Sequence, residues 1–187
     1  MEAFLTSTLV VALAEIGDKT QLLSLLLAAR YQKPLPIILG ILIATLANHF
    51  VAGALGAWIR SLLSAEALRW IVAISLLAIA AWTLKPDELE GEVKASTRYG
   101  VFALTCVAFF LAEIGDKTQI ATIVLAAKYH ALTLVVIGTT LGMMIANVPV
   151  VLLGAAASHR IPFRAVRIVA SLLFALLGAA ALLGIGA

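Results

Sequence analysis

Six long apolar stretches, separated by short polar segments, run along the chain. They cover residues 4–29, 35–59, 68–84, 99–127, 132–157 and 165–186. A helix needs about 20 apolar residues to cross the hydrocarbon core of a bilayer, and most of these stretches reach that length. The three tryptophans and three tyrosines fall near their ends, where membrane helices collect aromatic side chains. The pattern therefore predicts an all-α membrane protein with six transmembrane helices.

The composition excludes most soluble classes of protein. Of 187 residues, 63% are hydrophobic and 12% are charged, whereas soluble domains have roughly 45–50% and about 25%. A soluble enzyme or a nucleic-acid-binding domain could not bury so much apolar surface, and a disordered chain would need more charge. The net charge of +3 fits basic loops beside membrane helices better than a nucleic-acid partner. The single cysteine, Cys106, allows no internal disulfide.

The basic residues outside the apolar stretches are divided unequally between two sides. Arg60, Arg69 and Lys128 fall on one side, and eight basic residues fall on the other. Because loops rich in lysine and arginine stay in the cytoplasm, the second side is predicted to be cytoplasmic and both termini to lie outside. The eight residues are Arg30, Lys33, Lys85, Lys94, Arg98, Arg160, Arg164 and Arg167.

A sequence of nine residues occurs twice, 98 residues apart. Residues 13–21 are identical to residues 111–119, and weaker matches such as Gly40 with Gly138 continue along the chain. Each repeat holds three of the six predicted helices, and the odd number makes the second repeat enter the membrane from the opposite face. Two inverted three-helix repeats are typical of secondary transporters, whose substrate site lies near the midplane between the repeats.

These repeats and one connection account for the whole chain. We predict the first three-helix repeat at residues 1–84, an acidic cytoplasmic linker at 85–98 and the second three-helix repeat at 99–187. The acidic residues of the linker suit either a solvated connection or a cation-sensing segment, and they are Asp87, Glu88, Glu90 and Glu92.

Each repeated motif places two acids and a lysine near the middle of a predicted membrane helix. A charge at the bilayer centre costs roughly 2.5–3.5 kcal/mol on insertion scales, so such residues usually face a cavity or a partner. Positions three and four apart share a helix face, which predicts that the charges of each motif project together. Gly17 and Gly115 are hinge candidates, because glycine permits a bend or a break. The charged residues are Glu15, Asp18 and Lys19 in the first motif and Glu113, Asp116 and Lys117 in the second.

The potential ligands in the motifs are all oxygen atoms. Such hard ligands suit Ca²⁺, Mg²⁺ or Mn²⁺ better than Zn²⁺ or Cu⁺. The four acids and two lysines sum to a charge of −2, which a divalent cation or two protons would neutralise. The acids are therefore candidate metal ligands that exchange the cation for protons, unless Glu15–Lys19 and Glu113–Lys117 are salt bridges that lock the helices. Supporting side chains are Lys19, Thr20, Gln21, Lys117, Thr118, Gln119, Asn48 and Asn147.

A doubled Glu-x-Gly-Asp-Lys/Arg-Thr/Ser motif in a protein of six spans resembles the transmembrane protein 165 family, also called uncharacterised protein family 0016. The motif is present without departure at residues 15–20 and 113–118, and the resemblance extends over essentially the whole chain. It implies a Mn²⁺ and Ca²⁺ transporter of the cation/proton antiporter type, with the motif acids as ion ligands. The short termini and loops are similar to those of prokaryotic members, which implies the plasma membrane.

From the residues and this resemblance we predict a secondary transporter, not an enzyme, that exports Mn²⁺ in exchange for protons, with Ca²⁺ as the second candidate. Its expected partners are the ion, protons and the lipid bilayer, with no prosthetic group and no nucleic acid. The alternative is an exporter of small organic solutes such as basic amino acids, of the lysine-exporter type, because midplane acids could also bind an ammonium group. An enzyme acting on a lipid phosphate would need an arginine or a nucleophile that the motifs lack.

Overall fold

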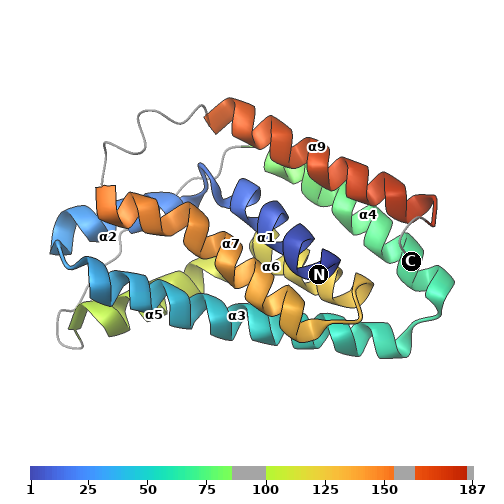
Figure 1. Ribbon diagram of the computed structural model, residues 1–187, viewed down its shortest axis with the longest axis horizontal. Helices are drawn as coiled ribbons and strands as arrows, with labels where there is room; N and C mark the ends of the chain where they lie inside the picture. Colours follow the sequence, from blue (N-terminus) through green and yellow to red (C-terminus); the bar gives the residue numbers. More distant parts are fainter. Residues whose placement is uncertain (86–99, 154–162, 185–187) are drawn as a thin grey trace.

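The computed structural model describes residues 1–85, 100–153 and 163–184, and every regular element in these ranges is an α-helix. The predicted all-α class is therefore confirmed. Most of the predicted acidic linker and the ends of the fifth and sixth predicted spans lie outside the described residues. The helices, shown in Figure 1, are α1 (Glu2–Glu15), α2 (Lys19–Tyr31), α3 (Pro34–Leu62), α4 (Ala65–Thr83), α5 (Gly100–Glu113), α6 (Lys117–Lys128), α7 (Leu132–Leu153) and α9 (Phe163–Leu182).

Four of the described helices are long and apolar enough to cross a membrane. They are α3, α4, α7 and the part of α9 from Arg164 to Leu182, and they match the second, third, fifth and sixth predicted spans. Large apolar side chains such as Leu9, Trp58, Ile74 and Leu176 are more than half exposed on the surface. An exterior of this kind suits contact with lipid and identifies an integral membrane protein.

The first and fourth predicted spans are each divided into two helices. α1 ends at Glu15 and α2 begins at Lys19, while α5 ends at Glu113 and α6 begins at Lys117. Both breaks lie at the motif glycines, where the sequence indicated that a helix could bend or open. The division explains why neither stretch is among the helices long enough to cross a membrane in one piece.

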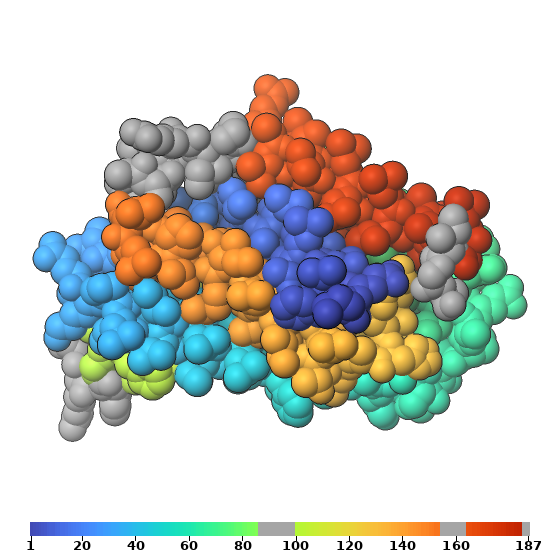
Figure 2. All heavy atoms as spheres, viewed as in Figure 1, coloured from blue at the N-terminus to red at the C-terminus, as the bar shows by residue number. Residues whose placement is uncertain are grey.

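Helices from the two halves of the chain are interleaved. α1 packs along α7, α3 packs against α5 and α6, and α4 packs along α9 (Figure 1). In the space-filling view, α1 in dark blue lies between α7 in orange and α9 in red (Figure 2). The main helix contacts therefore join the first half of the chain to the second.

Two glycines make an equivalent close contact in the two halves. A Cβ atom placed on Gly138 of α7 would lie 2.7 Å from the carbonyl oxygen of Phe4 in α1. A Cβ atom placed on Gly40 of α3 would lie 3.0 Å from the carbonyl oxygen of Phe102 in α5. Both glycines and both phenylalanines are separated by the 98 residues of the repeat. The backbones of neighbouring helices thus approach at matching positions, as small residues allow in membrane proteins.

Candidate functional site

Both motifs interrupt their helices in the same way. Gly17 and Gly115 have φ angles of 83° and 75°, a left-handed conformation that residues with a side chain rarely adopt. The Gly17 N–H group donates a hydrogen bond to Gln21 Oε1 (2.9 Å), and the Gly115 N–H group donates one to Gln119 Oε1 (2.8 Å). Each glutamine closes the turn that contains the glycine, so identical sequences build the same broken helix.

Asp18 and Asp116 cap the helices that follow the breaks. Their side chains accept hydrogen bonds from the backbone N–H groups of Lys19 (2.7 Å) and Thr118 (3.4 Å). A carboxylate in this position satisfies a free N–H group and the positive end of the helix dipole. The prediction that the three charges of a motif share one helix face is therefore wrong, because the glutamate ends one helix and the lysine begins another. Glu113 and Asp116 of the second motif nevertheless come together, with oxygens within 4.8 Å of one another.

The two lysines form ion pairs between the motifs. Lys19 Nζ lies 2.8 Å from Asp116 Oδ1, and Lys117 Nζ lies 3.0 Å from Asp18 Oδ1. The salt bridges considered from the sequence joined the glutamate and the lysine of one motif, whereas these pairs join an aspartate of one half to a lysine of the other. The broken helices make this pairing between the motifs possible, since each lysine stands at the start of a helix that faces the opposite motif.

Glu15 and Glu113 end the helices before the breaks, and both are fully buried. The Thr20 hydroxyl donates a hydrogen bond to Glu15 Oε2, and the Thr118 hydroxyl donates one to Glu113 Oε2 (2.8 Å). The second oxygen of each glutamate, Oε1, is buried without a hydrogen-bond partner among the described residues. A buried carboxylate oxygen is costly unless a donor, a proton or a cation satisfies it. These two atoms therefore indicate a place for a ligand.

Three carboxylates from the two motifs come together. Glu15, Glu113 and Asp116 are buried, and each offers an oxygen within 4.8 Å of the other two. Oxygen ligands lie about 2.0–2.6 Å from a divalent cation, so two ligands of one ion are at most about 4–5 Å apart. The group has the dimensions of a single cation site. Asp18, the fourth predicted ligand, lies outside this group and pairs with Lys117.

Four of the predicted supporting side chains, two glutamines and two asparagines, make hydrogen bonds between the two halves. Gln21 Nε2 donates to the carbonyl oxygen of Ala146 in α7 (3.0 Å), and Gln119 Nε2 donates to Asn48 Oδ1 in α3 (3.0 Å). Position 146 follows position 48 by the same 98 residues as the two glutamines. These contacts hold α2 on α7 and α6 on α3, so they fix the breaks relative to one another.

Ser24 belongs to this network, although the motif pattern did not mark it. Its hydroxyl donates a hydrogen bond to Asn147 Oδ1 (2.7 Å), and both residues are buried. Ser24 lies one helical turn after Thr20, and its equivalent in the second repeat is the similar residue Thr122. A small hydroxyl residue at the same position of both repeats was the available signal. The partner could not be read from the sequence, because the bond joins residues 123 positions apart.

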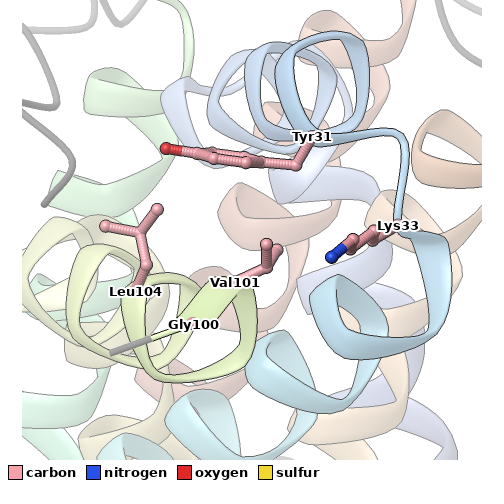
Figure 3. A pocket seen from close by; sticks show the side chains of 5 residues that line it. All are labelled: Tyr31, Lys33, Gly100, Val101 and Leu104. Carbon is pink, nitrogen blue, oxygen red and sulfur yellow. The ribbon is translucent and has the colours of Figure 1, made fainter. Parts of the chain in front are cut away.

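A cavity of about 210 Å³ lies apart from the motifs. Its lining consists of Tyr31 at the end of α2, Lys33 before α3, and Gly100, Val101 and Leu104 in the first turns of α5. Figure 3 shows the Tyr31 ring on one side of this space and Leu104 and Val101 on the other. Its lining includes no motif residue, so this cavity is not part of the site formed by the motifs.

The model of the family described as divalent cation/proton antiporter GDT1 matches residues 3–91 and 101–186 of the chain. Both matched ranges include a complete motif, at residues 15–20 and 113–118. The match therefore covers the two halves that supply the carboxylate group.

Curated relatives match along most of the chain. A protein of Vibrio cholerae named "Putative manganese exporter" is 54% identical over 181 residues, which cover 96% of this chain and 90% of the relative. GDT1-like protein 4 of Oryza sativa is 30% identical over 199 residues, covering 92% of this chain and 70% of the relative. GDT1-like protein 3 of Arabidopsis thaliana is 29% identical over 201 residues, covering 92% and 68%. No solved structure matches the chain.

Proposed function

The chain belongs to the divalent cation/proton antiporter GDT1 family, and from this premise we propose that it exports Mn²⁺ in exchange for protons. Membership agrees with the motif's resemblance to the transmembrane protein 165 family. The observation that carries the proposal is the buried group formed by Glu15, Glu113 and Asp116. Because this group draws ligands from both motifs, we propose one shared site for the two repeats.

The charges of the site balance when one divalent cation or two protons bind. The two lysines neutralise the two aspartates, so the two glutamates carry the remaining charge of −2. Each glutamate has one oxygen bonded to a threonine hydroxyl and one buried oxygen that a ligand can use. A cation between the glutamates, or a proton on each of them, restores neutrality in a site removed from water. Either ligand excludes the other, which is the chemistry that exchange requires.

Mn²⁺ is the proposed cargo and Ca²⁺ the second candidate. All three acids of the group offer hard oxygen ligands, which suit both ions. The name of the relative from Vibrio cholerae favours manganese and favours export. Neither the family nor the relatives support the alternative of an organic-solute exporter, and oxygens within 4.8 Å of one another suit an ion better than an amino acid.

We propose that the helices make six membrane crossings arranged as two inverted repeats. The broken helices α1–α2 and α5–α6 would each complete one crossing. Reciprocal ion pairs between the motifs and the matching contacts of Gly40 and Gly138 are what a two-fold axis between the repeats requires. The proposed repeats are residues 1–84 and 99–187, joined by the linker at 85–98. Motif glycines would serve as the hinges on which each crossing opens.

The proposed location is the plasma membrane of a prokaryote, with both termini outside. The division of basic residues, three against eight, supports this orientation. The bacterial relative at 54% identity supports a bacterial membrane.

Transport by the purified protein in liposomes tests this function. With a pH gradient and a Mn²⁺-sensitive dye inside, we expect gradient-driven Mn²⁺ flux for the wild type. The double variant Glu15→Gln/Glu113→Gln should show only the leak of empty liposomes, because the two charges that bind the cation or the protons are gone. Glu66→Gln is the control, since Glu66 is exposed in the first turn of α4.

Two outcomes would contradict the proposal. Flux at the wild-type rate in the double variant would show that the carboxylate group is not the transport site. If the wild-type protein moved neither Mn²⁺ nor Ca²⁺ under any pH gradient, cation/proton exchange would be rejected as its function. Repeating the assay with Ca²⁺ in place of Mn²⁺ decides between the two cargo ions.

A further inference from the structure

Lys19 and Lys117 occupy the same position of the motif but differ in their surroundings. The Lys19 side chain is 23% exposed, whereas the Lys117 side chain is 4% exposed. Their partners differ as well, because Asp116 belongs to the group of three carboxylates and Asp18 does not. Of the two ion pairs, Lys19–Asp116 is the one that shares an acid with the proposed cation site.

Asp116 is therefore a binding partner both for the ammonium group of Lys19 and for a cation in the proposed site. Lys19 Nζ lies 2.8 Å from Asp116 Oδ1, and the oxygens of the carboxylate group lie within 4.8 Å of one another. A cation bound among these oxygens would stand a few ångströms from the ammonium group. Like charges at such a distance repel strongly where little water screens them. Binding of the cation thus favours departure of Lys19 from Asp116.

Lys19 can leave without disturbing its helix. Its ammonium group is carried on a flexible stem of four carbons, and part of the side chain already reaches the surface. The start of α2 is held by the hydrogen bond from the Lys19 backbone N–H to Asp18, which does not involve the ammonium group. Movement of the side chain alone therefore frees Asp116.

We propose that Lys19 is a tethered cation, which occupies Asp116 while the transporter is empty and is displaced by the cargo ion. This inference rests on the proposed function of the carboxylate group as the cation site. By pairing with Asp116, the ammonium group of Lys19 neutralises one negative charge of the empty site. This pairing limits the affinity of the site for the divalent ion. Its return to Asp116 helps to expel the ion on the side of release. Lys19 is a positioning residue for exchange and not a ligand.

Calorimetric titration of the purified protein with MnCl₂ tests this role. Lys19→Gln should bind Mn²⁺ about tenfold more tightly than the wild type, because the internal competitor is removed. In liposomes both KM and kcat for Mn²⁺ should fall, since the ion binds better and leaves more slowly. A purely structural role predicts weaker binding and a raised KM. Lys33→Gln is the matched control, because it removes the same charge from an exposed lysine outside both motifs, and its affinity should stay within about twofold of the wild type.

Lys19→Arg provides a second test that does not depend on folding of the glutamine variant. A guanidinium group binds a carboxylate through two hydrogen bonds and is harder to displace than an ammonium group. This variant should therefore bind Mn²⁺ several-fold more weakly than the wild type, whereas a structural role predicts unchanged binding.

The outcomes separate this inference from the proposed function. A wild type that neither binds nor transports Mn²⁺ rejects the function itself. If the wild type does both, the role of Lys19 is rejected when Lys19→Gln binds no more tightly and Lys19→Arg binds no more weakly. Equal tightening in Lys33→Gln also rejects it, because the effect would then be one of net charge alone.

Discussion

Backbone conformation, and not crowding, explains why the second motif contains glycine. A Cβ atom on Gly115 would meet no described atom within 4 Å, yet the φ angle of this residue is 75°. A residue with a side chain pays roughly 1–2 kcal/mol in this conformation, and asparagine tolerates it better than most. The glycine is thus required by the turn that ends one helix and begins the next.

The glycine turn leads to a prediction about stability. Gly115→Ala should lower the free energy of unfolding by roughly 1–2 kcal/mol, because alanine is strained where φ is positive. Gly115→Asn is the comparison and should lose clearly less. Chemical unfolding in detergent micelles, followed by tryptophan fluorescence, measures both. Equal losses in the two variants would show that the left-handed conformation is not what the position requires.

At the residue scale, the sequence predicted which residues form the site but not which residues they contact. The acids, lysines and amides of the motifs could be selected from the sequence, because buried charges and an identical repeat stand out in an apolar chain. Their partners could not be selected. Lys19 pairs with Asp116, not with the glutamate four positions before it, since the helix on which that spacing depends is broken between them.

At the scale of elements, close approach of helix backbones holds the two halves together. α1 touches α7 at Gly138, and α5 touches α3 at Gly40, with carbonyl oxygens at 2.7 and 3.0 Å from where a Cβ atom would be. Backbone cannot move aside as the end of a flexible side chain can. These positions therefore fix how closely the helices that carry the glutamates lie against the opposite half.

Substitution at these contacts should loosen both halves alike. Gly138→Ala and Gly40→Ala should each lower the free energy of unfolding by about 1–3 kcal/mol, the usual cost of excess volume in a packed interior. Ala47→Leu is the control, because Ala47 is exposed on α3 and added bulk there meets lipid. Unfolding in detergent gives the three values. A loss in Ala47→Leu as large as in the glycine variants would argue against close helix contact as the cause.

At the scale of the whole molecule, inversion of the repeats can be tested by finding the side of the membrane on which two equivalent residues lie. Gln32 follows α2 and His130 follows α6, both are exposed, and they are equivalent positions 98 residues apart. Inverted repeats must place equivalent loops on opposite sides of the membrane. The unequal division of the basic residues predicts that the loop of Gln32 lies in the cytoplasm and that the loop of His130 lies outside.

Labelling of intact cells provides the measurement. In a Cys106→Ala background, His130→Cys should react with a membrane-impermeant maleimide, and Gln32→Cys should react only after the cells are permeabilised. Labelling of both from the same side would contradict inverted repeats. Labelling of Gln32→Cys alone in intact cells would keep the inversion but reverse the orientation.

The sequence by itself determined the apolar helices, the two equivalent halves, the acidic motifs and the family. These features depend on composition, periodicity and identity, which are local properties of the chain. Only the tertiary structure decided that each motif breaks its helix, that lysines and aspartates pair between the motifs, and that Glu15, Glu113 and Asp116 form one group without Asp18. The reason for the pairing and for the carboxylate group is physical: the ion pairs, and the approach of Glu15 to Glu113 and Asp116, join residues about a hundred positions apart, and helix packing alone brings them together.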